Sequence, residues 1–183
     1  MKTSLILLML IFTIGLAPNI TPDNQLPKPP NGYSWEKLDA ISGYILKPDG
    51  WFFNAEKNAN TYAYFITKED FTKDPNGMFV TGFSLNVFTN MGKTNAVDYA
   101  ISMANELKGQ GGLVFIQDHE FSNFKGKMLR VKKNGKTIHY DILGNTKTNI
   151  LYLAYFESSN SKWSENEEFG KVIMNNLGFN PNF

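Results

Sequence analysis

The chain has no cysteine, a single arginine and no apolar run of the roughly 20 residues that a membrane-spanning helix needs. Without cysteine it cannot form a disulfide, a thiolate metal site, a cysteine nucleophile or a lipid-modified cysteine. Bidentate clamps on phosphates and carboxylates use arginine, so the sole arginine, Arg130, argues against a large anion-binding surface. The sequence also lacks a G-x-S-x-G elbow, a phosphate-binding loop and an H-E-x-x-H helix. We therefore expect no enzyme activity, no metal and no cofactor.

The overall charge is also close to zero, with 18 basic against 17 acidic residues. A balanced chain has no general electrostatic attraction to nucleic acid or to an anionic membrane, so neither is an expected partner. Aromatic residues make up 14% of the chain, with 15 Phe and 8 Tyr. Because a domain of about 150 residues buries roughly 68–70% of its unfolded surface, this content can hold the fold without disulfides.

The first residues have the pattern of an export signal. Lys2 is followed by an uncharged, mostly apolar segment from Ser4 to Ala17. Residues 18–32 contain five of the eight prolines, which favour an extended chain. We expect a signal peptide at 1–17, a Pro-rich tether at 18–32, one domain at 33–180 and a tail at 181–183. The mature protein would then be exported to the periplasm or secreted, with no transmembrane span.

Apolar and polar residues alternate along 62–66 and 79–88, which predicts two strands that each bury one face. The Asp-Pro-Asn-Gly turn at 74–77 predicts that they form a hairpin with a long loop. Residues 149–156 and 113–116 are apolar on both faces, which is typical of central strands covered on both sides. The sheet is therefore expected to carry helices on both faces.

Asn134-Gly135 is the clearest local signal, because both positions tolerate the positive φ of a two-residue hairpin turn. Such a loop pairs Lys133 with Lys136 and fixes the pairs beyond them. One face then carries an apolar set that is expected to point into the core, and a slip of one residue would bury charges instead. The expected pairs are Val131–Ile138 and Leu129–Tyr140 on that face, and Arg130–His139 and Met128–Asp141 on the outer face.

Two segments have the apolar spacing of helices. Residues 94–108 carry one apolar stripe and are followed by a glycine-rich stop. A second helix is expected to begin at Ser164, where Glu167 has the spacing of a capping box, and to end at Gly178. The order of elements predicts an α+β fold, in which a largely antiparallel sheet of about six or seven strands packs between helices as an α/β/α sandwich.

Residues 43–51 read Gly-Tyr-Ile-Leu-Lys-Pro-Asp-Gly-Trp, a strand followed by a Pro-Asp-Gly turn and a tryptophan. Near the start of a domain with this order of elements, the segment resembles the PsbP-like superfamily, which includes exported bacterial proteins. The resemblance implies a central antiparallel sheet between helices, and docking on other proteins rather than catalysis. It implies no functional residues, because the matching positions look structural.

Four aromatic residues are candidates for binding. Trp51 follows the Pro-Asp-Gly turn, and we expect it to anchor the core, with a place in a pocket wall as the alternative. Trp163 precedes the second helix and is expected to act as a hydrophobic staple, with an exposed contact as the alternative. Tyr62 and Tyr64 lie on an expected strand. With Trp51 they would line the pocket of a carrier for a small apolar ligand.

His139, Arg130 and Asp141 are expected to share the outer face of the hairpin. A base held by a carboxylate uses such neighbours, but an ordinary cross-strand charge arrangement explains them as well, and no reacting partner lies beside them. Asp118-His119-Glu120 has the composition of a metal site, yet on a strand its two acids face away from its histidine. Residues 118–126 have the composition of a loop.

Positive charge gathers in the same hairpin. Lysines prevent edge-to-edge pairing of strands, and alternation divides them between two faces, so a solvated edge is the plainer interpretation. The alternative is a docking patch for an acidic partner surface, whose binding would weaken as salt rises. The residues concerned are Lys125, Lys127, Arg130, Lys132, Lys133 and Lys136.

These observations favour an exported, non-catalytic binding or accessory module of the cell envelope, whose partner is another envelope or secreted protein. A carrier of a small apolar ligand is the leading alternative, and a hydrolase acting through His139 is a weaker one. A carrier needs an enclosed apolar cavity of roughly 300–1,000 Å³, and an enzyme needs polar groups that converge in a cleft. A docking module needs an exposed apolar or charged patch.

Overall fold

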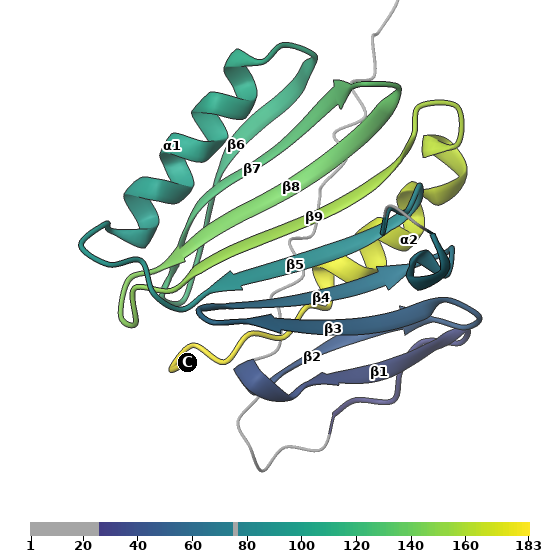
Figure 1. Cartoon of the computed structure of the whole chain (residues 1–183), viewed down its shortest axis with the longest axis horizontal. Coiled ribbons are helices and arrows are strands. Elements are labelled where there is room, and N and C mark those ends of the chain that lie inside the picture. The colour runs from purple at the N-terminus through teal and green to yellow at the C-terminus, as the bar shows by residue number, and fades with distance from the viewer. Residues whose placement is uncertain (1–25, 75–76) are drawn as a thin grey trace, which may run out of the picture.

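The computed structural model describes residues 26–74 and 77–183 of the chain (Figure 1). The expected signal peptide at 1–17, the first part of the expected tether and residues 75–76 of the expected turn lie outside the described residues. The described residues form nine strands and two α-helices. None of the helices in this part of the chain is long and apolar enough to cross a membrane.

Seven strands form one antiparallel sheet in the order β3-β4-β5-β9-β8-β7-β6. A separate antiparallel pair joins β1 (Tyr33–Leu38) to β2 (Gly43–Pro48) and lies beyond the β3 edge (Figure 1). The strands of the large sheet are β3 (Phe52–Asn58), β4 (Thr61–Thr67), β5 (Gly82–Phe88), β6 (Leu113–Phe121), β7 (Phe124–Lys133), β8 (Lys136–Asn145) and β9 (Leu151–Ser159).

The β7–β8 hairpin has the register that the sequence predicts. Asn134 and Gly135 adopt positive φ values of 51° and 77° in the turn, and Lys133 pairs with Lys136. Each of the four pairs expected beyond the turn is formed. Leu129 and Val131 are buried, so the apolar face of the hairpin points into the core as expected.

The two helices cover opposite faces of the sheet. Helix α1 (Ala96–Gly109) packs on β7 and β8, whereas α2 (Trp163–Asn175) and β2 pack on the other face (Figure 1). The sheet separates two apolar clusters, one around α1 and a larger one around α2 and the small sheet. The structure therefore confirms the α+β class and the antiparallel sheet packed between helices.

Helix α1 is fixed at its start by a cap and by close contact with the sheet. The Asn95 side chain accepts hydrogen bonds from the backbone N–H groups of Val97 and Asp98. A Cβ on Gly144 of β8 would lie only 2.3 Å from the Val97 nitrogen, so the helix rests directly on this glycine. The stripe that faces the sheet is made of small residues, which permit this approach: Ala96, Ala100 and Ala104.

Two expectations about the segment after α1 were wrong. Residues 113–116 begin β6, which is the edge strand and not a central one, and Leu113 and Val114 are exposed. A short apolar run gives no information on what covers a strand, which explains the error. Residues 118–126 continue β6 through a tight turn at Ser122 into β7, so they are not a loop.

The start of α2 also differs from the expectation. The helix begins at Trp163, after Lys162, and no side chain caps it. Ser164 therefore lies inside the first turn, and the expected capping box with Glu167 is not formed. Trp163 is the first residue of the helix and does not precede it.

The last residues are bound to the end of the sheet. The Asn145 side-chain amide donates to the Pro181 carbonyl at 3.1 Å, and the Thr148 hydroxyl donates to the Phe183 carbonyl at 2.7 Å. The Phe179 ring packs 4.7 Å from that of Tyr152, centre to centre. The chain after α2 thus closes one end of the larger apolar cluster.

Candidate functional site

Arg130 lies at the centre of a group of polar and aromatic side chains on the face of the sheet opposite α1. Its Nη2 atom donates hydrogen bonds to Glu167 Oε1 at 2.9 Å and to His139 Nδ1 at 3.4 Å. The guanidinium carbon lies 5.3 Å from the ring centre of Phe115 and 4.9 Å from that of Trp163. Strands β6, β7 and β8 and the start of α2 therefore meet at one side chain. We call these five residues the Arg130 cluster.

The Arg130 cluster is half-buried. The side chains of Arg130 and Glu167 are 20% and 26% exposed, so water screens their ion pair less than a surface pair. The Arg130 Nε atom is buried without a hydrogen-bond partner in the described part of the chain, which costs about 1–3 kcal/mol. Arg130 and His139 share the face opposite Leu129 and Val131, as expected, but the start of α2 covers this face, so it is not fully exposed to solvent.

His139 is neutral in this setting. Burial lowers its pKa, and the positive charge of Arg130 lowers it further, while the negative charge of Glu167 opposes both only in part. The pKa of His139 consequently falls to about 4. A neutral imidazole can accept the Arg130 hydrogen bond at Nδ1, but a base this weak takes up few protons near pH 7. This property does not favour a hydrolase acting through His139.

The second histidine belongs to a different pair. His119 Nδ1 and Asp141 Oδ1 lie 2.8 Å apart and join β6 to β8 across β7. Burial alone would lower the pKa of His119, but the hydrogen bond and charge of Asp141 outweigh it and raise that pKa. Burial raises the pKa of Asp141, and His119 opposes this. Asp141 therefore pairs with His119 and not with His139, which the sequence did not predict. The described contacts of His119 include no hydroxyl group that it could activate as a base.

The acidic neighbours of His119 have partners of their own. Asp118 pairs with Lys127, and Glu120 pairs with Lys125, both on the other face of β6. Alternation along the strand separates these acids from the histidine, as predicted. Among residues 26–74 and 77–183, no group of three or more metal-binding side chains lies close enough together to hold an ion.

Most of the positive charge in the β7–β8 hairpin is neutralised by neighbouring acids. Lys133 instead donates a hydrogen bond to the Gln110 side chain, after the end of α1. The Lys132 ammonium is exposed and has no hydrogen-bond or ion-pair partner among the described residues. The charge that remains available to a partner is therefore at the hairpin tip. The cations that pair with a carboxylate are Lys125, Lys127, Arg130 and Lys136.

Two exposed apolar residues adjoin these tip lysines. Leu113 is 36% exposed and Val114 is 51% exposed, and both begin the edge strand β6. We call Leu113, Val114, Lys132 and Lys133 the β6 patch. The two lysines were predicted as candidates from the sequence, whereas the apolar pair was not. No local signal identifies it, because a run of four apolar residues before Gln-Asp-His-Glu does not show that the strand lies at the edge of the sheet.

Backbone contacts hold the β6 patch together. The Lys132 N–H donates to the Gly112 carbonyl at 2.8 Å, and Leu113 pairs with Val131. Gly112 has a φ of +71°, and a Cβ there would collide with the Lys132 carbonyl, so only glycine permits this approach. The apolar pair is thus positioned by strands beside the lysines and does not depend on a mobile loop.

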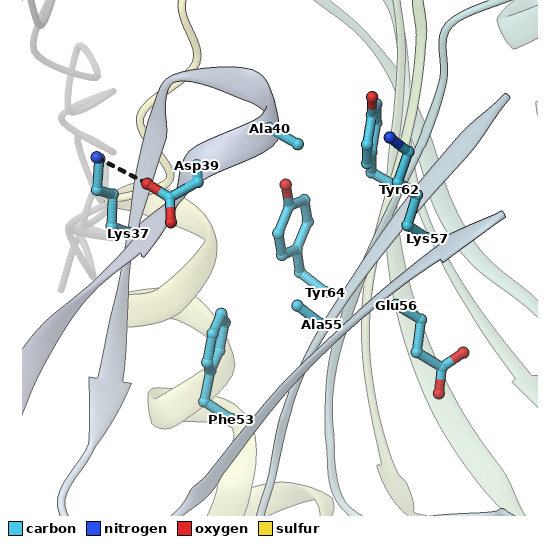
Figure 2. Close-up of a pocket in the computed structure, with 9 residues that line it drawn as sticks. All are labelled: Lys37, Asp39, Ala40, Phe53, Ala55, Glu56, Lys57, Tyr62 and Tyr64. Carbon is cyan, nitrogen blue, oxygen red and sulfur yellow. Dashed lines mark ion pairs between the residues drawn. The ribbon is translucent and has the colours of Figure 1, made fainter. Parts of the chain in front are cut away.

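The predicted aromatic residues do not share one pocket. Tyr62 and Tyr64 line a groove of about 260 Å³ between β3, β4 and the 3-10 turn at Asp39–Ile41 (Figure 2). Trp51 instead lies in the core, with its ring centre 5.2 Å from that of Phe169. Trp163 packs on Phe156, with 5.9 Å between the ring centres.

The groove beside Tyr64 has charged groups at its rim. Figure 2 shows the Tyr64 hydroxyl directed across the groove toward Ala40, beside a Lys37–Asp39 ion pair of 2.7 Å. On the other wall, Lys57 lies 5.4 Å from the ring centre of Tyr62. A carrier of an apolar ligand needs an enclosed apolar cavity, and this open, charged groove does not provide one.

Comparison with known proteins gives a likeness of fold. The chain is similar to the solution structure of cyanobacterial PsbP (CyanoP) from Synechocystis sp. PCC 6803, with 13% identity and a TM-score of 0.47 over 87% of this chain and 99% of that one. It is also similar to a crystal structure from Bacteroides thetaiotaomicron VPI-5482, with 13% identity and a TM-score of 0.39 over 75% of this chain and 44% of that one. No family model and no curated protein matches the sequence.

At this identity the likeness concerns the fold alone. No binding residue, partner or activity is transferred from either structure to this chain.

Proposed function

We propose that this protein is an exported, non-catalytic binding module that docks on another envelope or secreted protein through the β6 patch. One observation carries the proposal: Leu113 and Val114 are exposed at the edge of the sheet beside two lysines that no carboxylate neutralises in the described structure. An apolar contact flanked by available charge is the usual composition of a protein-binding surface.

The apolar half of the patch supports docking because exposure of this kind is costly at a sheet edge. Edge strands attract other chains, and proteins usually place charges there to prevent it. The middle of β6 follows that pattern, with Asp118 and Glu120 paired to lysines of β7. The start of β6 does not, since Leu113 and Val114 stand there. We infer that this part of the edge is covered by a partner.

The charged half of the patch specifies the chemistry of that partner. Lys132 and Lys133 are exposed and lack acidic partners among the described residues, so an acidic partner surface would complement them. Two exposed charges contribute to attraction over about a Debye length, roughly 8 Å at physiological salt. Binding is therefore expected to weaken as salt rises, without being abolished, because the apolar contact remains.

Export is the second part of the proposal. The leader pattern at 1–17 and the proline-rich segment after it support delivery beyond the cytoplasm. The absence of cysteine is compatible with an oxidising compartment, because the domain depends on no thiol. Detection of the cleaved protein in a periplasmic or culture fraction would test this part independently of binding.

A pair of matched variants tests docking. Val114→Asp places a charge in the β6 patch, whereas Val80→Asp changes a valine of the same 51% exposure in the segment before β5, outside the patch. We expect affinity capture from the native envelope to recover a partner with wild type and Val80→Asp, and at least about tenfold less of it with Val114→Asp. Equal recovery by both variants would contradict the proposal.

A further inference from the structure

The start of α2 is attached to the sheet through Arg130 of β7 and also through β9, where the Trp163 ring lies on Phe156 and the buried Asn166 side chain donates to Ser158 Oγ at 3.0 Å. Farther along, the helix is anchored by Gly170 and Ile173, which are buried against the core. On the β7 side of its first turns, Arg130 forms the ion pair with Glu167 and lies against the Trp163 ring. Arg130 therefore acts as a latch between β7 and the beginning of α2.

This latch requires a neutral His139. The guanidinium has only donors, so its contact with Nδ1 of His139 exists only while that nitrogen carries a lone pair. A proton on Nδ1 replaces the acceptor by a donor and adds a second positive charge about 3.4 Å from Arg130 Nη2. In a half-buried site this repulsion is stronger than in water.

The charged groups around His139 offer no free carboxylate that could compensate the positive charge of an added proton. Glu167 of α2 is the facing carboxylate, but Arg130 already engages it, and Lys171 lies 3.7 Å from it. His119 of β6 contributes further positive charge, and Asp141 of β8 is taken by His119. The aromatic neighbours, Phe115 of β6 and the cross-strand residue Phe156 of β9, carry no charge.

We propose that His139 makes the latch sensitive to acid: its protonation displaces the Arg130 guanidinium from Glu167 and from the Trp163 ring, and so frees the β7 side of the first turn of α2. The helix stays attached to β9 through Asn166 and to the core through its apolar stripe. The device lies on the face opposite α1 and uses none of the residues of the β6 patch.

The pH range in which the latch weakens follows from the direction in which the pKa of His139 is shifted. The latched state holds the His139 pKa at about 4, below the ordinary value of about 6.5 that an exposed histidine regains. Protons therefore favour the released state, and the latch weakens as the pH falls from about 6.5 toward 4. The difference between these two values allows at most about a 300-fold increase in the ratio of released to latched molecules.

The test uses the three tryptophans as ¹⁹F reporters in protein labelled with fluorotryptophan. The signal of Trp163, assigned with Trp163→Phe, is followed from pH 7.5 to 4, while the core residue Trp51 reports on global unfolding. We expect the Trp163 signal to move toward a solvent-exposed position while the Trp51 signal stays unchanged. In His139→Gln, which keeps an uncharged acceptor, this movement should disappear, and in His119→Gln it should persist.

A second measurement needs no variant, and so tests the proposal even if a substituted protein fails to fold. The chain has only two histidines, so their ring protons can be titrated separately by NMR in the wild type. We expect the His139 curve to coincide with the movement of Trp163. Movement of Trp163 that persists in His139→Gln, or protonation of His139 with Trp163 unmoved, would overturn the proposal.

Discussion

The two faces of strands β6–β8 differ sharply although they alternate residue by residue. On one face α1 lies on Leu129 and Ile142, which are fully buried among apolar neighbours. On the other face the adjacent residues, Arg130 and Asp141, are ionisable and half-buried. A whole helix, with a stripe of alanines toward the sheet, lies over the first face, whereas the second has only the start of α2. Alternation along a strand thus determines which face of the sheet a residue lies on. The helix that covers the face determines how far water is excluded from it.

The largest effect is expected on the α1 face. Leu129→Ala removes a fully buried side chain under α1 and leaves a cavity, so the free energy of unfolding should fall by about 2–5 kcal/mol. The matched control is Met128→Ala, which truncates the half-exposed neighbour on the other face and should cost about 1 kcal/mol or less. Urea unfolding measures both. Equal losses would mean that the two faces do not differ in packing.

The next effect concerns pH on the other face. Because the folded-state pKa of His139 is about 4, its contribution to stability is complete above about pH 6.5 and is lost as the pH falls toward 4. The loss should reach at most about 3 kcal/mol and should be absent in His139→Gln. Unfolding by urea across this pH range measures it. If the free energy of unfolding depended on pH in the same way in the wild type and in His139→Gln, His139 would not be the group responsible.

The pH dependence of the stability that His119 contributes has the opposite sign to that of His139, although both lie on the same face of the sheet. Asp141 raises its pKa above the ordinary value, so its stabilising contribution is complete below about pH 6.5 and is lost as the pH rises through the folded-state pKa. His119→Gln should therefore lose stability mainly on the acidic side of that pKa. This variant serves as the control for the His139 prediction.

A smaller effect is expected from Arg130→Met. The substitution removes the ion pair with Glu167, but that pair is partly exposed and Met retains apolar contact with the Trp163 ring. We expect a loss of about 1–2 kcal/mol in the free energy of unfolding. Adding Glu167→Gln should recover part of it, because the unpaired carboxylate is then gone. No recovery in the double variant would mean that the pair does not hold the start of α2.

The smallest effect on stability is expected at the start of β6, where Leu113 and Val114 are exposed. Val114→Asp should change the free energy of unfolding by about 0.5 kcal/mol or less, as should Val80→Asp. Thermal melts of the two variants provide the check. A large loss for Val114→Asp would mean that the residue supports the fold and that reduced partner recovery is indirect.

Short-range signals in the sequence predicted much of this architecture. The Asn134-Gly135 turn fixed the register of β7 and β8, and hence placed Arg130 opposite His139. The spacing of apolar residues located α1 to within two residues at its start. These features depend on neighbours in the chain, and local pattern is informative there.

Features that depend on distant contacts were not predicted. The His119–Asp141 pair requires β6 to lie beside β7, and the turn at Ser122 that places it there has no strong residue signal. The cover over Arg130 depends on where α2 crosses the sheet, which no local pattern specifies. Strands β1 and β3 were also missed. The exposure of Val114 follows from the position of β6 at the edge, and a run of four apolar residues does not reveal it.

The most direct test of docking at the β6 patch is photo-crosslinking in the native host. A photoreactive residue is placed at position 114 or at position 80 of the full chain, and adducts are compared after irradiation. We predict a discrete adduct with another protein from position 114, weakened by Lys132→Glu with Lys133→Glu, and none from position 80. Adducts that are equal at both positions, or absent from position 114 while the partner is still captured, would contradict the proposed function.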